Sequence, residues 1–180
     1  RDYELLSANP AEQVRTVHAA RQKSRVAFST EDLSRIFNSP IYTDNYRPVA
    51  GTNPPKFKVV WGAEFTRRCQ RILDDSLERA RGAVLAVAVN ADRYLSAHST
   101  RCPKPLTGDP EKDLVGNRTC RKFERPPEVR AARNTEAMLL QTYLRDTGEV
   151  LCDIAMPIMV NGRHWGNVRI GAPAEALLER

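Results

Sequence analysis

The dipeptide Asn161-Gly162 lies between two apolar segments, residues 149–160 and 163–171. Asn-Gly suits a two-residue type I′ turn because both central positions of that turn need positive φ angles, and between apolar runs it is the strongest short-range signal of a β-hairpin. Thr147-Gly148 separates the first segment from a further candidate strand, residues 138–146. The C-terminal part of the chain therefore predicts a three-stranded antiparallel meander.

The hairpin also predicts which residues lie opposite each other. With a two-residue turn, Ile158 faces Trp165 and Ile154 faces Arg169, and residues that face each other share one side of the sheet. Pro157 lacks an N–H, so it indicates an edge position or a bulge, which would break this register. Neither side of the hairpin is cleanly apolar. We therefore expect both faces of the sheet to be covered, one by a long helix and one by an irregular segment.

Upstream, apolar residues at three- and four-residue spacing predict one clear helix over residues 57–81, which Gly82 ends. Two short strands are then predicted, near residues 84–90 and 94–99. Residues 100–137 form a long irregular segment, in which only a short helix around residues 114–123 is expected. Such a long segment in a compact domain is either functional or disordered, and its charge cluster favours a function. Residues 11–37 are compatible with a helix.

Charge is concentrated in one part of this irregular segment. The chain carries a formal charge of +6, and residues 118–133 hold six basic residues against two acidic ones. Phe123 is the one aromatic residue among them, whereas a nucleic-acid surface would interleave several aromatic residues with its charges. A small anionic ligand fits such a local cluster better than a duplex does, and no nucleic-acid partner is expected.

Recognisable catalytic and metal-binding motifs are absent from the sequence. It contains no Walker loop, no nucleophile elbow and no H-E-x-x-H pattern, and its three histidines lie on different predicted elements. The four cysteines form no C-x-x-C pair, which argues against a zinc site or a c-type haem. We therefore expect no enzyme activity, no metal and no cofactor. The sequence leaves open whether Cys102 and Cys120, which flank a loop, form a disulfide.

Polar residues near the third predicted strand are candidates for ligand contacts. Gln141 and Tyr143 are two residues apart, so they point to the same face of their strand. Arg133 and Asn134 come just before this strand. Arginine matches the geometry of a carboxylate with two parallel hydrogen bonds. The alternatives are that Gln141 and Tyr143 form an exposed polar face, and that the arginines belong to a solvated loop.

The order of several short motifs resembles a known family. Residues 83–171 resemble the periplasmic single-Cache (PAS-like) domain of methyl-accepting chemotaxis proteins, and the match extends upstream to about residue 46. The motifs that carry the resemblance are Gly51-Thr52-Asn53-Pro54-Pro55-Lys56-Phe57, Ala131-Ala132-Arg133-Asn134-Thr135, Leu139-Leu140-Gln141-Thr142-Tyr143, Arg145-Asp146-Thr147-Gly148-Glu149-Val150 and Gly162-Arg163-His164-Trp165-Gly166. Asp92-Arg93-Tyr94 departs from the Asn-Gly-Tyr that the family often shows near its first hairpin.

The resemblance implies an α+β fold in which a five-stranded antiparallel sheet carries a long N-terminal helix on one face and a ligand pocket on the other. Residues 46–180 would form the sensing domain, and residues 1–45 a juxtamembrane helical lead-in. The candidate ligand-binding residues in the matching segments are Tyr94, His98, Arg118, Arg121, Arg133, Asn134, Gln141 and Tyr143. Asp153 is a further candidate, either to bind a ligand amine or to anchor an arginine.

The function expected from this resemblance is that of an extracytoplasmic sensor. The chain would be the periplasmic domain of an inner-membrane chemoreceptor that binds a small organic molecule, such as acetate or another short carboxylate. The sequence begins at Arg1 and holds no run near the roughly 18 apolar residues of a membrane span, so we expect a piece of a longer, membrane-anchored protein. The full receptor is expected to be a homodimer, and the isolated fragment to dimerise weakly or not at all. The alternatives are the sensor domain of a histidine kinase or cyclase, and a redox or haem sensor.

Overall fold

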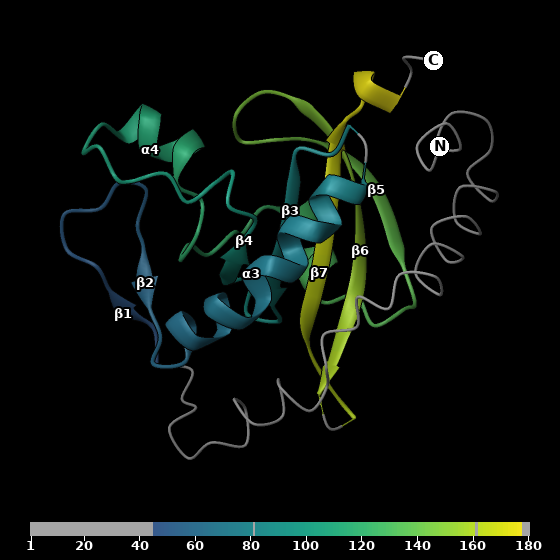
Figure 1. Ribbon diagram of the computed structural model, residues 1–180, viewed down its shortest axis with the longest axis horizontal. Coiled ribbons are helices and arrows are strands. Elements are labelled where there is room, and N and C mark those ends of the chain that lie inside the picture. The colour runs from purple at the N-terminus through teal and green to yellow at the C-terminus, as the bar shows by residue number, and fades with distance from the viewer. Residues whose placement is uncertain (1–44, 81, 161, 178–180) are drawn as a thin grey trace.

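A computed structural model of the chain describes residues 45–80, 82–160 and 162–177 (Figure 1). The helix expected within residues 11–37, and with it nearly all of the predicted lead-in, lies outside these residues. In chain order the elements are β1 (Arg47–Pro48), β2 (Phe57–Lys58), α3 (Gly62–Arg79), β3 (Leu85–Asn90), β4 (Leu95–His98), α4 (Pro110–Gly116), α5 (Pro126–Ala132), β5 (Leu139–Leu144), β6 (Val150–Val160), β7 (Arg163–Pro173) and the 3-10 helix η1 (Glu175–Leu177).

The central sheet is antiparallel throughout and has the strand order β4-β3-β7-β6-β5. Its strands fall within two or three residues of the five that the sequence predicts. The predicted α+β class with a five-stranded antiparallel sheet is thus confirmed. A separate two-stranded sheet pairs β1 with β2.

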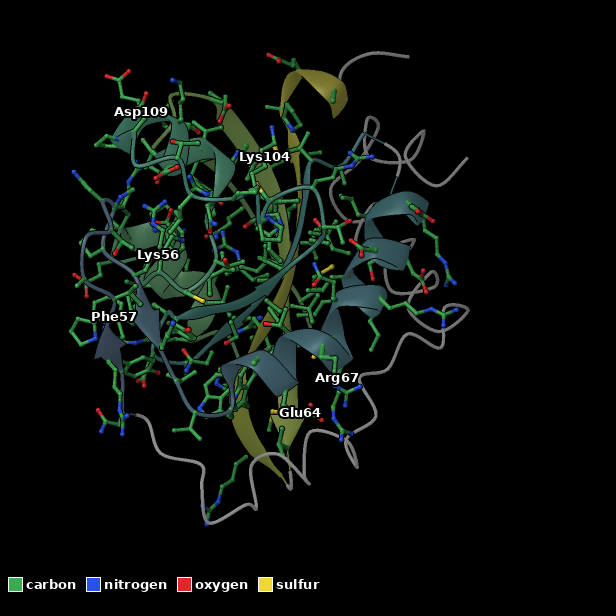
Figure 2. The ribbon with its side chains drawn as sticks, turned by 60° about the vertical axis from the view of Figure 1, so that its left-hand side comes forward. Lys56, Phe57, Glu64, Arg67, Lys104 and Asp109 are labelled. Atoms are coloured by element: carbon green, nitrogen blue, oxygen red, sulfur yellow. The ribbon has the colours of Figure 1, made fainter. Side chains whose placement is uncertain are left out.

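Helix α3 packs diagonally across one face of the central sheet (Figure 1). It buries Phe65, Cys69, Leu73 and Leu77, the stripe that the three- and four-residue spacing predicts. The helix begins at Gly62, later than expected, because residues 57–58 pair with β1 instead. Its outer surface is polar: Glu64 and Arg67 lie there (Figure 2), and Arg67 NH2 donates to Glu64 Oε1 at 2.7 Å.

Both faces of the sheet are covered, as expected. On the α3 side, Trp61 and Phe65 pack against Trp165 and Tyr94 in one apolar cluster. On the opposite side, residues of the long segment 100–137 cover a second cluster, to which α5 contributes Ala132 and the chain before it Phe123. The sheet residues of this second cluster are Leu85, Val87, Val89, Leu95 and Leu151.

The β6–β7 hairpin departs from the predicted register because it contains a bulge between Ile158 and Met159. The pairing between the bulge and the turn keeps the predicted register. Beyond the bulge every pair is shifted by one residue, and the proline in β6 is the sequence signal for this break in register. The predicted pairs are therefore wrong there: Ile158 faces Gly166 and not Trp165, and Arg169 faces Ala155 and not Ile154.

The helices of the segment 100–137 also differ from the prediction of one helix over residues 114–123. Helix α4 starts earlier because Asp109 caps it: its side chain accepts hydrogen bonds from the N–H groups of Glu111 and Lys112, and a proline fills the first helical position. The chain leaves the helical path after Gly116, and Cys120 has a φ of +62°, which a helix cannot contain. Helix α5, which the sequence analysis does not predict, begins at Pro126-Pro127.

Candidate functional site

A small pocket lies on the sheet face opposite α3, between the sheet and the segment that connects α4 to α5. Its apolar floor and walls are Leu85, Val87, Val89, Leu95 and Phe123, and its polar lining is His98, Arg118, Glu128, Tyr143, Arg145 and Arg169. The centres of water-sized molecules can occupy about 30 Å³ of it, and one water needs roughly 10–15 Å³ by the same measure. The pocket therefore has room for two or three waters, or for a ligand of a few atoms.

At one end of the pocket, Arg169 is held by two side chains of neighbouring strands. Its Nε donates to Asp153 Oδ2 at 2.7 Å, its NH2 group also contacts that oxygen, and NH2 donates to the Tyr143 hydroxyl at 2.7 Å. Arg169 and Asp153 are both buried. Burial raises the pKa of Tyr143 above its usual range, so its hydroxyl keeps its proton at neutral pH. The guanidinium is thus fixed in place before any ligand arrives.

A second ion-pair cluster surrounds Asp146, which follows β5. Arg118 NH2 lies 2.7 Å from Asp146 Oδ1, and Arg121 NH2 lies 3.6 Å from Asp146 Oδ2. Both guanidinium groups stack over the ring of Phe123, at 5.1 and 4.8 Å from its centre. Burial alone would raise the pKa of Asp146, but the two arginines more than offset it and lower the pKa below its usual value. This carboxylate is therefore ionised and orients both cations.

The buried histidine of the pocket is neutral. Burial lowers the pKa of His98 to about 4. Its Nδ1 lies 3.1 Å from the carbonyl oxygen of Ser99. Because a carbonyl oxygen only accepts hydrogen bonds, Nδ1 carries the proton there, and Nε2 is the acceptor of the ring. His98 therefore adds a polar group to the pocket without adding charge.

The charged groups around the pocket do not balance. The four arginines Arg118, Arg121, Arg145 and Arg169 face three carboxyl groups inside the protein, Asp146, Asp153 and Glu128, and Arg145 also pairs with the solvent-exposed Glu149. With His98 neutral and the solvent-exposed Glu149 left out, the remaining groups carry a net charge of +1 when all three carboxyl groups are ionised. Burial raises the pKa of Glu128, and protonation of this carboxyl group would make the net charge more positive. A buried net charge is costly unless a counter-charge joins it. The electrostatics of the pocket thus favour a monoanion.

Five of the nine residues predicted from the sequence lie in or beside this pocket. His98, Arg118 and Tyr143 line it, and Arg121 adjoins it through Asp146. Asp153 lies beneath Arg169, where it anchors an arginine, one of the two roles considered for it. These residues come from four separate parts of the chain, which the order of the strands brings together.

The structure places the other four predicted residues outside the pocket. Tyr94 lies on the α3 side of the sheet, where its hydroxyl donates to Phe57 O at 2.9 Å. The side chain of Gln141 donates to Pro127 O at 3.0 Å beneath α5, and that of Asn134 donates to Glu136 O at 3.0 Å in the turn after this helix. Arg133 is exposed at the end of α5. None of these four is among the residues that line the pocket.

Sequence reasoning missed three charged residues of the lining: Glu128, Arg145 and Arg169. A signal for Arg169 was present, since a charged residue in the middle of an apolar strand needs a partner when it is buried. Arg145 stands at the end of β5 beside the turn, where a solvated charge is the ordinary expectation. Glu128 was counted only as one of two acids in a basic segment.

Other classes of site find little support in the part of the chain that the structure describes. All four cysteines are free thiols, so Cys102 and Cys120 form no disulfide here. Among the described residues, no three His, Cys, Asp or Glu side chains gather as a metal site would need. Within the same residues, no helix combines the length and the apolar character of a membrane span.

Comparisons with known proteins give distant similarity to solved structures alone. No protein-family model matches the chain, and no curated protein matches it. Among solved structures it is similar to an extracellular ligand binding receptor from Desulfohalobium retbaense DSM5692, with 12% sequence identity and a TM-score of 0.42. The match covers 89% of this chain and 25% of that chain.

Proposed function

We propose that this chain is a sensor domain that binds a small monocarboxylate in the pocket opposite α3. The observation that carries the proposal is the concentration of arginine around a pocket for a few atoms: four guanidinium groups against three carboxyl groups inside the protein and the solvent-exposed Glu149, with a neutral histidine beside them. Guanidinium is the group that best matches a carboxylate, because it offers parallel N–H donors at the right spacing.

Preorganisation supports a role in binding. Asp146 and Asp153 hold three of the arginines through ion pairs, so little side-chain freedom remains to be lost when a ligand arrives. The fourth, Arg145, pairs with the half-exposed Glu149 at 3.4 Å and is the most adaptable of the four cations. We assign it the direct contact with the ligand carboxylate, together with Arg118.

The size of the pocket supports a short acid. Space for two or three waters suits acetate, propionate or a similar acid, whereas a dicarboxylate or an aromatic acid would need the pocket to open. The apolar residues Val87 and Leu95 then pack against the short aliphatic part of the ligand. The proposed role is binding without turnover.

The proposed signal is a shift between two packings of the segment that covers the pocket. This segment and β5 supply the arginines, while β7 supplies Arg169 and continues toward the C-terminal end of the described chain. A ligand that bridges the covering segment and β7 stabilises the packing that it binds more tightly. The shift between the two packings can be no larger than the difference in its affinity for them. In the full protein, we propose that residues 46–180 form the periplasmic domain of a membrane-anchored, homodimeric chemotaxis receptor, and that residues 1–45 link it to the membrane.

A thermal-shift screen tests this function. A ligand that binds only the folded state raises the melting temperature, by an amount that grows with its concentration above Kd. We expect formate, acetate or propionate to raise Tm and the uncharged isostere acetamide to leave it unchanged, at constant ionic strength. If acetamide stabilises the domain as much as acetate does, or if no short acid stabilises it, the carboxylate assignment is wrong.

A further inference from the structure

Two acids of the segment 100–137 are buried, Asp113 and Glu128, and of these only Glu128 lines the pocket. It lies in the first turn of α5, its side chain lines the pocket, and the residue is 5% exposed. Its Oε2 atom is buried and has no hydrogen-bond partner among the described residues. By contrast, Glu124 on the same segment is exposed. A buried carboxylate oxygen without a donor is costly, so an unpartnered one that faces a pocket indicates that the ligand supplies a donor.

The two donors that a small acid can carry beside its carboxylate are an ammonium and a hydroxyl group. The net charge of the cluster distinguishes them. With Glu128, Asp146 and Asp153 ionised, and apart from the solvent-exposed Glu149 that pairs with Arg145, the groups of the pocket carry +1, which a monoanion neutralises and a zwitterionic amino acid does not. A plain acid such as acetate balances the charge but leaves Glu128 Oε2 without a donor. A hydroxy acid satisfies both conditions at once.

We propose that the pocket selects short 2-hydroxy acids such as glycolate or lactate, whose carboxylate faces Arg118 and Arg145 while the hydroxyl group donates to Glu128 Oε2. This inference rests on the proposed function, and it names the class of acid that the same site prefers. Glycolate is one atom larger than acetate, so it still suits a pocket of this size. Burial raises the pKa of Glu128, and the nearby charge of Arg169, which also lines the pocket, opposes this effect in part.

Calorimetric titration of the wild-type chain with glycolate, acetate and glycine at pH 7 tests the selection without any substitution. We expect glycolate to bind roughly tenfold more tightly than acetate, the effect of one hydrogen bond to a charged group, and glycine to bind more weakly than both. Equal affinities for glycolate and acetate would overturn the selection and leave the carboxylate site standing. Tighter binding of glycine would also overturn it, in favour of an amine ligand. If none of the three binds, the proposed function itself fails.

Two variants test whether Glu128 causes the preference for glycolate over acetate. Glu128→Ala should bring the affinity for glycolate down to that for acetate, and Glu128→Gln, which keeps an acceptor oxygen but no charge, should retain part of the difference. Glu124→Ala serves as the matched control on the exposed part of the segment and should keep the full difference. A melting curve without ligand confirms that each variant is folded. If Glu128→Ala is folded and still prefers glycolate tenfold, another group accepts the hydroxyl, and the assignment to Glu128 is wrong.

Discussion

Arg169 and Asp153 form a buried ion pair between the neighbouring strands β7 and β6, with Arg169 Nε donating to Asp153 Oδ2 at 2.7 Å. The bulge at Ile158 makes this contact possible. In an unbroken hairpin Arg169 would face Ile154 and share its side of the sheet, and Asp153 would point to the other side. The shift of one residue puts Arg169 opposite Ala155 and brings Asp153 onto its face.

Removal of one partner should therefore be costly. We expect Asp153→Ala to lower the free energy of unfolding by roughly 3–5 kcal/mol, because it leaves the Arg169 guanidinium buried without a counter-charge. Urea denaturation monitored by circular dichroism measures the change. The matched control is Glu149→Ala, which removes the partner of Arg145 in a half-exposed pair and should cost less than about 1 kcal/mol. Equal losses in the two variants would show that the Arg169–Asp153 pair is solvated.

Gly166 should tolerate no side chain. A Cβ atom at this position would lie 2.1 Å from Val89 O and 2.5 Å from Asn90 Cα, both backbone atoms of the adjoining strand β3. We expect Gly166→Ala to destabilise the domain by roughly 3 kcal/mol or to prevent folding, since β3 and β7 must separate to admit the methyl group. Gly116→Ala is the control: its Cβ would have only ordinary contacts with Lys104, at 3.6 Å, and the domain should keep its stability. A fully stable Gly166→Ala variant would contradict the observed pairing.

Stability should fall in mild acid because of His98. Burial lowers its pKa to about 4 in the folded state, against about 6.5 in an unfolded chain. Between these values the unfolded chain binds more protons, so this contribution is complete above pH 6.5 and is lost as the pH falls toward 4. The difference over the whole window is about 3 kcal/mol.

Urea denaturation at pH 7 and pH 4.5, on the wild type and on His98→Gln, measures this contribution. The wild type should lose more stability than the variant between the two pH values, since glutamine does not titrate. If the two proteins lose the same amount, His98 is protonated in the folded domain and the neutral ring described for the pocket is wrong.

The sheet could be predicted from the sequence because each strand is indicated by its own residues and by those of the adjoining turns. Turn residues and apolar runs locate the five strands, and the stripe from Phe65 to Leu77 locates the face of α3. The bulge is different, because Pro157 indicates that the register breaks but not where. The unbroken register therefore predicts the wrong face for Arg169, and its pairing with Asp153 does not follow from the sequence.

Only some of the pocket residues could be predicted, because local patterns do not determine to which face of the sheet each side chain points. The resemblance and the charge cluster identified the segment of Arg118 and Arg121, but not the direction of each side chain. Tyr94 immediately precedes a strand, where one residue of difference decides between the two faces, and its neighbour Leu95 lines the pocket instead. Arg133 follows α5, and the position of that helix depends on long-range packing against β7 that no local pattern encodes.

The most direct test of the carboxylate pocket is calorimetric titration of three proteins with acetate and glycolate: the wild type, Arg145→Ala and Arg133→Ala. Arg145 lines the pocket, whereas Arg133, which the sequence predicts as a ligand contact, is exposed at the end of α5. We predict that Arg145→Ala loses roughly 2–5 kcal/mol of binding free energy, because the ligand charge loses its partner, and that Arg133→Ala binds as the wild type does. Wild-type affinity in Arg145→Ala, or a loss confined to Arg133→Ala, would contradict the location of the pocket.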